Sequence, residues 1–309
     1  MQVSVARVPL YAAGLVVIVA AAVAGCSPST NSSAGATGSA SAGASGSSST
    51  APANALDAVK LAAKTASSAN SFTGTMSLQV TVKPGAASSS GSSGAVSMTA
   101  TYAERLHPSL LASVNMNIAS LGAAGTSMPG GIEEIITPST LYMKWSYLTQ
   151  MLHLSKPWLA ISVPSISQSS GIDLSQIFSQ MSGSDPLTQS QLLQGATSVH
   201  QVGTGSIDGV PVTEYTGTVP LRKAMSYISG AAKTQLQQAI ASAGFTDETY
   251  TVWIDGQHSV RKAIITEVGK TVSESVTTTT TSINQPVNIA VPTASQTSQL
   301  SGGDLSGLS

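Results

Sequence analysis

Residues 72–82 read FTGTMSLQVTV, and this stretch decides the fold class. Phe72, Met76 and Leu78 stand in one phase, and threonine, serine and glutamine side chains fill the positions between. A period of two is typical of a β-strand with one face in the core and the other in water. The pattern returns at residues 95–106, after a loop rich in proline, glycine and serine at residues 83–94, and this predicts a hairpin with a long connection.

Outward from this hairpin, the same alternation continues through most of the chain. We expect further strands at residues 110–118, 132–137, 140–145, 156–161, 197–203, 210–219, 248–254, 260–268 and 270–283. We expect helices after Asn54, at residues 147–154, in two short pieces between residues 173 and 196, and at residues 221–243, where Gly244 ends the longest helix. About ten strands joined mostly by hairpin-like connections predict an α+β fold built on an antiparallel sheet.

Charge is scarce in this sequence. Its 309 residues carry 13 lysines and arginines against 14 acidic side chains, a formal net charge of −1, and 9% of residues are charged. An ordinary domain carries about 25%. No charged residue occurs between residues 106 and 132. Proteins that bind nucleic acid neutralise several phosphates with clustered basic side chains, so we expect no nucleic-acid partner.

The amino end has the pattern of an export signal. Arg7 is its only charged residue, an apolar run follows at residues 10–23, and the segment closes on VAGC at residues 23–26. The apolar run is short for a membrane-spanning helix. The closing residues resemble a bacterial lipobox, which implies cleavage before Cys26 and a diacylglyceryl group on its thiol. We therefore expect residues 1–25 to be a lipoprotein signal peptide and Cys26, the only cysteine, to anchor the mature protein to the membrane.

Composition divides the rest of the chain into three segments. Residues 26–53 consist mainly of serine, threonine, alanine, glycine and proline without any charge, so we expect a disordered tether. Residues 54–292 carry the strand and helix patterns and form the expected folded domain. Residues 293–309 are expected to form a flexible tail.

The order of these features is characteristic of a known family. A helix and a run of antiparallel strands precede a helical insertion near residues 156–158, then come the segment GTGSIDGVPVTEYTGTV at residues 203–219, a long helix, and the pair VWID and VRK at residues 252–255 and 260–262. With the lipobox, this order resembles the actinobacterial LolA-like lipoproteins of the LppX/LprG group. The resemblance implies a curved half-barrel sheet covered by helices, an apolar cavity for acyl chains, and lipid or lipoprotein handling instead of catalysis.

The side chains themselves also favour a cavity. Only three phenylalanines and three tryptophans serve the folded domain, so large side chains are few, while eight of the nine methionines lie in that domain and offer an adaptable lining. The alternative, that these are ordinary core residues, stays open. The expected lining consists of Phe72, Met76, Leu78, Val114, Met116, Met143, Trp158, Phe178 and Met225.

Enzyme and metal signatures are weak. Ser259 and Lys262 match a Ser-x-x-Lys pattern, but on a predicted strand instead of a helix start. Residues 269–271 read GKT without the glycine that opens a phosphate-binding loop, and we expect a hairpin turn. Glu133 and Glu134 are adjacent, so they point to opposite faces of a strand, and we expect a solvated strand edge there. The four histidines lack metal-ligand spacing: His107, His153, His200 and His258.

Two classes of function follow from the sequence. The first is a lipid-anchored carrier or sensor on the outer face of the cell membrane, which holds an acyl chain in the cavity under a lid made by the helices and by residues 121–131. The second is a protein-binding envelope module, such as a stress-signalling regulator, with a filled core. For both we expect a monomer without cofactor, metal or catalysis, with an envelope protein as a further partner.

Overall fold

The structure is a computed structural model that describes residues 54–83, 94–120, 130–151, 153–162, 192–228 and 230–299. The expected signal peptide, the tether, Cys26 and Phe178 lie outside these ranges, as do most of the expected lid loop at residues 121–131 and most of the helices between residues 173 and 196. What the sequence predicts for them stays a prediction.

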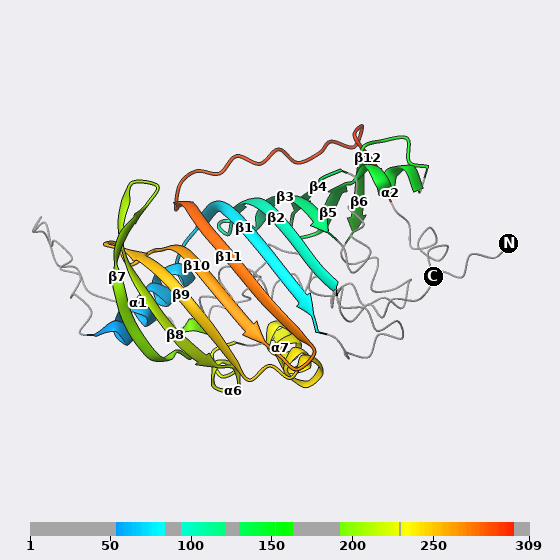
Figure 1. The fold of residues 1–309 in the computed structure, drawn as a ribbon. Helices are drawn as coiled ribbons and strands as arrows, with labels where there is room; N and C mark the ends of the chain where they lie inside the picture. The colour runs from blue at the N-terminus through cyan, green and yellow to red at the C-terminus, as the bar shows by residue number, and fades with distance from the viewer. Residues whose placement is uncertain are drawn as a thin grey trace, which may run out of the picture.

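Twelve strands of the described chain form one sheet (Figure 1). They are β1 (Ser71–Val82), β2 (Gly94–Arg105), β3 (Leu111–Ser120), β4 (Ile132–Ile136), β5 (Thr140–Lys144), β6 (Trp158–Ser162), β7 (Thr197–Ile207), β8 (Val210–Pro220), β9 (Asp247–Asp255), β10 (Val260–Val268), β11 (Val272–Ile283) and β12 (Thr297–Gln299). Their order is β12-β6-β5-β4-β3-β2-β1-β11-β10-β9-β8-β7. All neighbours are antiparallel except β12 and β6, which are parallel. The predicted antiparallel sheet is therefore confirmed, with one short parallel addition.

Four helices are described: α1 (Ala55–Ser67), α2 (Ser146–Met151), α6 (Leu221–Ala224) and α7 (Gly230–Ala243). Asn54 caps α1 as predicted, because its side-chain oxygen accepts a hydrogen bond of 2.9 Å from the Asp57 amide. The single long helix predicted at residues 221–243 is wrong, since the chain forms α6 and α7 there. Serine and glycine are poor residues for a helix interior. The Ser226 hydroxyl donates to the Lys223 carbonyl, and α7 begins at Gly230.

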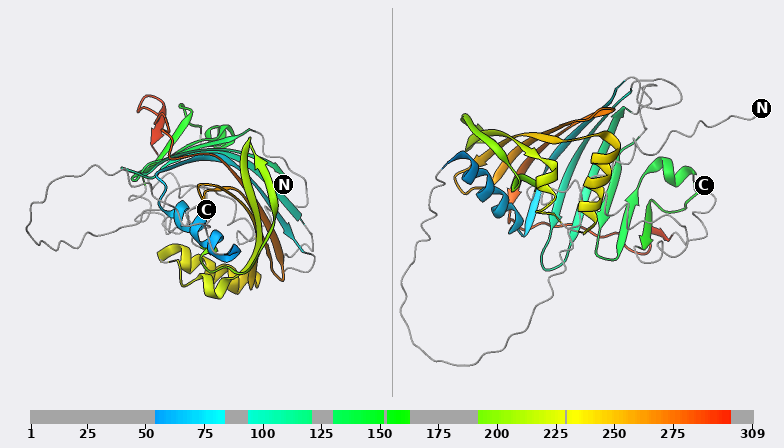
Figure 2. Two further views of the ribbon diagram at one scale, coloured as in Figure 1. Left: turned by 90° about the vertical axis from the view of Figure 1, so that its left-hand side faces the viewer. Right: turned by 90° about the horizontal axis from the view of Figure 1, so that it is seen from below.

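The sheet is strongly curved, and α1 and α7 lie on its concave side (Figure 2). α1 packs through Val59, Ala62 and Ala63 against apolar residues of β8, β9 and β10. α7 packs through Leu236 and Ile240 in a cluster with Leu221 of α6, Phe245 and Val272 at the start of β11. Gly244 ends α7 with a φ of +72°, as its position in the sequence predicts.

The concave face carries two apolar clusters. The larger, called the strand cluster below, contains Ala69, Phe72, Met76, Leu78, Val80, Met98, Ala100, Tyr102, Leu110, Ala112, Val114, Met116, Ile136, Leu141 and Val276. All of these residues come from strands or from the connections at Ala69 and Leu110. The second cluster, called the helix cluster, joins α1, α6 and residues 192–196 to β8, β9 and β10. Described helices thus contribute to the helix cluster and not to the strand cluster.

Two glycines inside strands leave room for tyrosine rings. Gly74 of β1 is paired with Tyr102 of β2, and Gly217 of β8 with Tyr250 of β9. A Cβ atom added at either glycine would lie 2.5 Å from the hydroxyl oxygen of the paired tyrosine. Both tyrosines are buried, so each ring covers the backbone of the neighbouring strand at the point where that strand has no side chain.

The sheet extends further toward the carboxyl end of the chain than the sequence predicts. Residues 284–296 run back along the sheet to β12 (Figure 1). The Trp158 amide donates to the Gln296 carbonyl at 3.1 Å, and Lys156 Nζ donates to two carbonyls of the segment, each at 2.9 Å. The predicted domain end at residue 292 is therefore too early, because the sheet includes residues up to Gln299. Three residues of strand have too few alternations to be recognised in a sequence.

Candidate ligand-binding face

The strand cluster is built by the register of β1, β2 and β3. Met76 is paired with Ala100, and Ala100 with Met116, so two flexible side chains flank a small one. In the next row, Leu78 is paired with Met98. Methionine adapts its shape to its neighbours more readily than branched side chains do. These side chains of β1, β2 and β3 therefore form an apolar surface that suits partners of varied shape.

Five of the nine predicted lining residues lie in the strand cluster: Phe72, Met76, Leu78, Val114 and Met116. Met143 packs against it. Trp158 lies apart, in a small cluster with Leu111 and Ile135, because Leu159 is the β6 residue in register with Met143. Met225 is half-buried after α6 and belongs to neither cluster, and Phe178 is outside the described residues.

A small pocket lies between the two clusters. Its walls are the last turn of α1, the start of β1 and the concave sides of β10 and β11. It is lined by Thr65, Ala66, Phe72, Leu193, Ser259, Val260, Ala263, Ile265, Thr278, Thr280 and Ile283, and its volume is about 40 Å³. Sites for small molecules usually measure about 300–1,000 Å³, so this pocket does not hold an acyl chain by itself.

Glu134 places a carboxyl group on the apolar face. It is paired with Val114 on one side and Met143 on the other, is 1% exposed, and its Oε2 has no hydrogen-bond partner. Burial raises the pKa of Glu134 to about 7. The solvated strand edge predicted for the glutamate pair is wrong for Glu134, because β4 lies inside the sheet and Glu134 shares the phase of Ile132 and Ile136. Only Glu133 faces water, in a 3.0 Å ion pair with Lys144.

Three glutamates, called the glutamate row below, cross the concave face beyond the strand cluster. Glu248 of β9 is paired with Glu267 of β10, and Glu267 with Glu274 of β11. Directly paired antiparallel residues have Cβ atoms about 4.5–5.5 Å apart, so the three side chains leave the same face of the sheet next to one another. Glu248 is 1% exposed and its Oε1 has no partner, while the other two are half-buried. The row ends beside Val80 of the strand cluster, with which Glu274 is paired.

Burial raises the pKa of all three carboxyl groups, and neighbouring glutamate charges add to the rise at Glu248 and Glu274. Burial raises the pKa of Glu267 to about 7. Burial, with the neighbouring charge of Glu267, raises the pKa of Glu274 to about 8. Burial followed by both neighbouring charges raises the pKa of Glu248 well above its usual value. The sequence holds a signal for one member of this row, since Glu248 shares the phase of Tyr250 and Val252.

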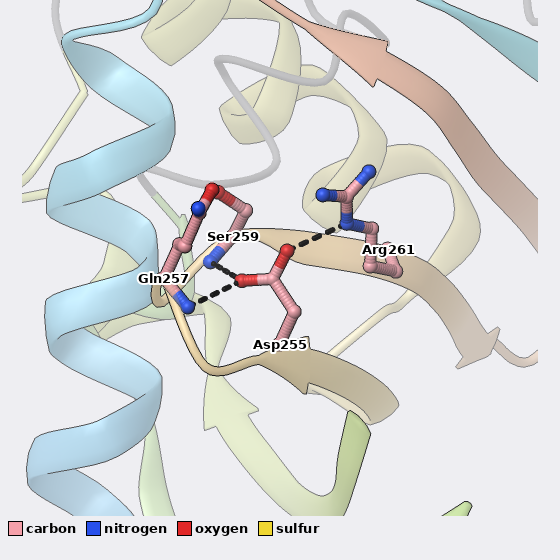
Figure 3. A network of polar contacts seen from close by, with 4 residues as sticks. All are labelled: Asp255, Gln257, Ser259 and Arg261. Atoms are coloured by element: carbon pink, nitrogen blue, oxygen red, sulfur yellow. Dashed lines mark hydrogen bonds and ion pairs between the residues drawn. The ribbon is translucent and has the colours of Figure 1, made fainter. Parts of the chain in front are cut away.

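Asp255 organises the turn between β9 and β10 (Figure 3). Its Oδ1 accepts hydrogen bonds of 2.9 Å from the amides of Gln257 and Ser259. Its Oδ2 accepts a bond of 2.6 Å from Arg261 Nε, in a pair whose side chains are 3% and 18% exposed. These contacts hold the hairpin in place next to the pocket, which Ser259 lines.

The structure shows where the Ser-x-x-Lys pattern and the GKT segment of the sequence lie. Lys262 Nζ lies 4.9 Å from the centroid of the Trp253 ring, on the face opposite Ala263 and the pocket. Ser259 lines that pocket, so the serine and lysine are on different sides of the sheet. The turn predicted at residues 269–271 is confirmed, because the Gly269 amide donates to the Val272 carbonyl at 2.8 Å.

Among the described residues, no group of three or more histidine, cysteine, aspartate and glutamate side chains has an arrangement that could hold a metal ion. Within the same ranges, no helix has the length and apolar character needed to cross a membrane.

Comparison with known proteins gives structural likenesses only. No protein-family model matches the chain, and no curated protein matches it. The lipoprotein LppX from Mycobacterium tuberculosis is 20% identical, with 76% of this chain and 97% of that chain covered and a TM-score of 0.42. LprF from Mycobacterium bovis is 14% identical, with 77% and 96% covered and a TM-score of 0.46. A LolA superfamily protein from Nitrosomonas europaea is 7% identical, with 76% and 94% covered and a TM-score of 0.26.

The LolA-like lipoproteins named by the sequence resemblance thus appear again among the similar solved structures. At these identities the likeness concerns the fold alone.

Proposed function

We propose that this protein is a lipid-anchored binding protein of the cell envelope, which holds an acyl chain against the concave face of its sheet for carriage or sensing. The observation that carries this proposal is the strand cluster, an apolar and methionine-rich face whose members are at most 8% exposed and to which no described helical side chain contributes. Such a face is stable when apolar groups cover it. α1 covers the neighbouring helix cluster in this way, and an acyl chain is the proposed partner of the strand cluster.

The curvature of the sheet supports the same proposal. The sheet bends around a concave side that already holds α1 and α7 (Figure 2). In the proposed complex, the sheet and these helices form a half-barrel, and the helices expected between residues 173 and 196 close it over the ligand. The loop expected at residues 121–131 acts with them as the lid. Phe178, which belongs to the expected helical segment, is the proposed contact from that side.

The proposed location is the outer face of the cell membrane. A diacylglyceryl group on Cys26 would hold the protein there, because two acyl chains give stable membrane attachment. The uncharged tether at residues 26–53 would then place the folded domain at an average distance of about 25–30 Å from the anchor. At that distance the domain can exchange an acyl chain with the membrane or with an envelope protein.

We further propose that the protein binds its ligand without transforming it. The motif residues Ser259 and Lys262 lie on different sides of the sheet. A serine nucleophile needs a base within hydrogen-bond reach, and Lys262 instead stacks on Trp253. Asp255 is occupied by the turn amides and by Arg261.

A variant that fills the concave face with a larger side chain tests the proposal. Ala100 is 5% exposed between two methionines, so Ala100→Trp places a large ring on the binding surface. We expect this variant to bind a fluorescent fatty acid at least about tenfold more weakly than the wild type. Thr101→Trp is the matched control, because Thr101 is exposed on the other face of the same strand and should leave binding unchanged.

The measurement uses protein freed of its anchor and of bound lipid. Wild-type protein that carries no acyl ligand by mass spectrometry after purification, and that takes up no fluorescent fatty acid, would refute the proposal. Circular dichroism and thermal melting check that each tryptophan variant is folded. If Ala100→Trp does not fold, the wild-type uptake measurement still decides the question.

One observation favours the second candidate, a protein-binding envelope module with a filled core. The pocket between the clusters has a volume of only about 40 Å³, as expected when side chains fill the interior. This candidate predicts no fatty-acid uptake and one specific envelope protein in crosslinking experiments on intact cells. The uptake measurement therefore distinguishes the two functions.

A further inference from the structure

The glutamate row is the most unusual feature of the concave face. The ion pairs of Lys144 with Glu133 and of Arg261 with Asp255 include no member of the row. Three neighbouring carboxyl groups that have no ion pair with a described basic residue repel one another when ionised, and burial adds to that cost. A row of this kind is stable when the carboxyl groups hold protons or when a cation lies on them.

A second observation points to a partner from outside the chain. Glu248 is 1% exposed, and its Oε1 has no hydrogen-bond partner. The hydroxyl of Tyr250, two residues along the same face, is also buried without a partner. The Tyr250 hydroxyl lies toward Gly217 of β8, on the side of β9 away from Glu267. Buried polar atoms are nearly always paired, so the unpaired Oε1 of Glu248 indicates that a polar group of a ligand satisfies it.

The position of the row shows where the rest of such a ligand lies. Glu274 is paired with Val80, which is a member of the strand cluster. The row therefore adjoins the apolar surface directly. Glu267 and Glu274 are half-buried, so the row is reached from the concave side and is not sealed in the interior.

We propose that Glu248, Glu267 and Glu274 form the head-group subsite of the concave face and bind the ammonium group of a cationic amphiphile, whose chain lies along the strand cluster. This inference rests on the proposed function, because it names the class of lipid that the same face takes. An ammonium group donates up to three hydrogen bonds and carries the charge opposite to the row. The half-buried Glu267 and Glu274 receive the charge, and the buried Glu248 supplies its unpaired Oε1 as an acceptor.

Three probes with the same twelve-carbon chain test the head-group preference. Dodecylamine, dodecanol and dodecanoate are titrated into the protein by calorimetry at pH 8, below the concentrations at which they form micelles. We expect dodecylamine to bind about tenfold more tightly than dodecanol, since a charge-assisted hydrogen bond is roughly twice as strong as a neutral one. Dodecanoate should bind more weakly than dodecanol because it carries the charge of the row.

Variants of the row assign the preference to these residues. Glu274→Gln and Glu267→Gln keep the shape of each side chain and remove its charge, and each should reduce the advantage of dodecylamine over dodecanol to about threefold or less. Asp247→Asn is the matched control, because it removes one negative charge from an exposed residue on the opposite face of β9. If one of the two row variants fails to fold, the other still provides the test.

The outcomes separate this inference from the proposed function. Equal binding of dodecylamine and dodecanol overturns the inference and leaves the acyl-chain site in place. An advantage that Asp247→Asn removes as strongly as the row variants also overturns it, because general surface charge then explains the preference. Binding of Ca²⁺ or Zn²⁺ that the row variants abolish identifies a metal site and refutes the ammonium subsite. If none of the three probes binds, both the inference and the proposed function are refuted.

Discussion

Replacement of Glu134 by glutamine should change how the stability of the protein depends on pH. Glu134 is 1% exposed, and burial raises its pKa from 4.5 to about 7. Between these two values the folded protein holds a proton on Glu134 that the unfolded chain releases. The stabilising contribution is therefore complete below pH 4.5 and is lost as the pH rises through about 7.

The size of the effect follows from the shift. One pKa unit corresponds to about 1.4 kcal/mol, so a rise from 4.5 to about 7 costs the folded protein about 3 kcal/mol once Glu134 is ionised. Most of this loss, about 2–3 kcal/mol, falls between pH 5 and pH 8. Glutamine does not titrate, so the Glu134→Gln variant should gain that amount on the wild type over this range.

Urea unfolding at pH 5 and pH 8 measures the effect. The free energy of unfolding is compared between wild type and Glu134→Gln at each pH, and any constant cost of the amide cancels in the difference. Glu133→Gln is the control, because Glu133 lies on the outer face of the same strand in an ion pair with Lys144. The difference in unfolding free energy between wild type and Glu134→Gln is compared at the two pH values. If it changes by less than about 0.5 kcal/mol, Glu134 is not desolvated and its placement on the concave face is wrong.

Three further predictions concern the fold and the anchor. Gly217→Ala places a Cβ 2.5 Å from a tyrosine hydroxyl and should lower the free energy of unfolding by about 1–3 kcal/mol in urea. Gly203→Ala, whose Cβ would meet nothing within 4 Å, should change it little, and equal effects would contradict the glycine–tyrosine packing. Asp255→Asn weakens the 2.6 Å contact with Arg261 and should cost about 1–3 kcal/mol in the same assay, whereas an unchanged midpoint would show that the turn does not depend on that charge. The intact mass of protein extracted from membranes should include a diacylglyceryl group that Cys26→Ser abolishes, and an unmodified wild-type mass would refute the lipid anchor.

Much of the central sheet could be predicted from the sequence because its strands are long. The alternation at residues 72–82 identifies β1 and also its concave face, on which Phe72, Met76 and Leu78 lie. The turn between β7 and β8 is equally local, since Asp208 and Gly209 both adopt positive φ angles that these residue types tolerate. Features determined by neighbours in sequence are thus accessible without a structure.

Features that depend on distant residues could not be predicted in this way. β12 has three residues and is held by Lys156 and β6, more than one hundred positions earlier in the chain. The face occupied by Trp158 depends on the pairing of Leu159 with Met143, and β6 has too few residues to show its phase. The glutamate row exists only because the registers of β9, β10 and β11 bring three glutamates into line. Each is a consequence of strand pairing.

The most direct test of the central claim locates a bound acyl chain on the protein. Palmitate that carries a photoreactive diazirine is bound to the delipidated protein and irradiated, and the labelled peptides are identified by mass spectrometry. We expect labels on concave residues of β1, β2 and β3, among them Met76 and Met116, which excess unlabelled palmitate suppresses. Labels confined to the outer face of the sheet, or no label that unlabelled palmitate suppresses, would refute an acyl-chain site on the concave face.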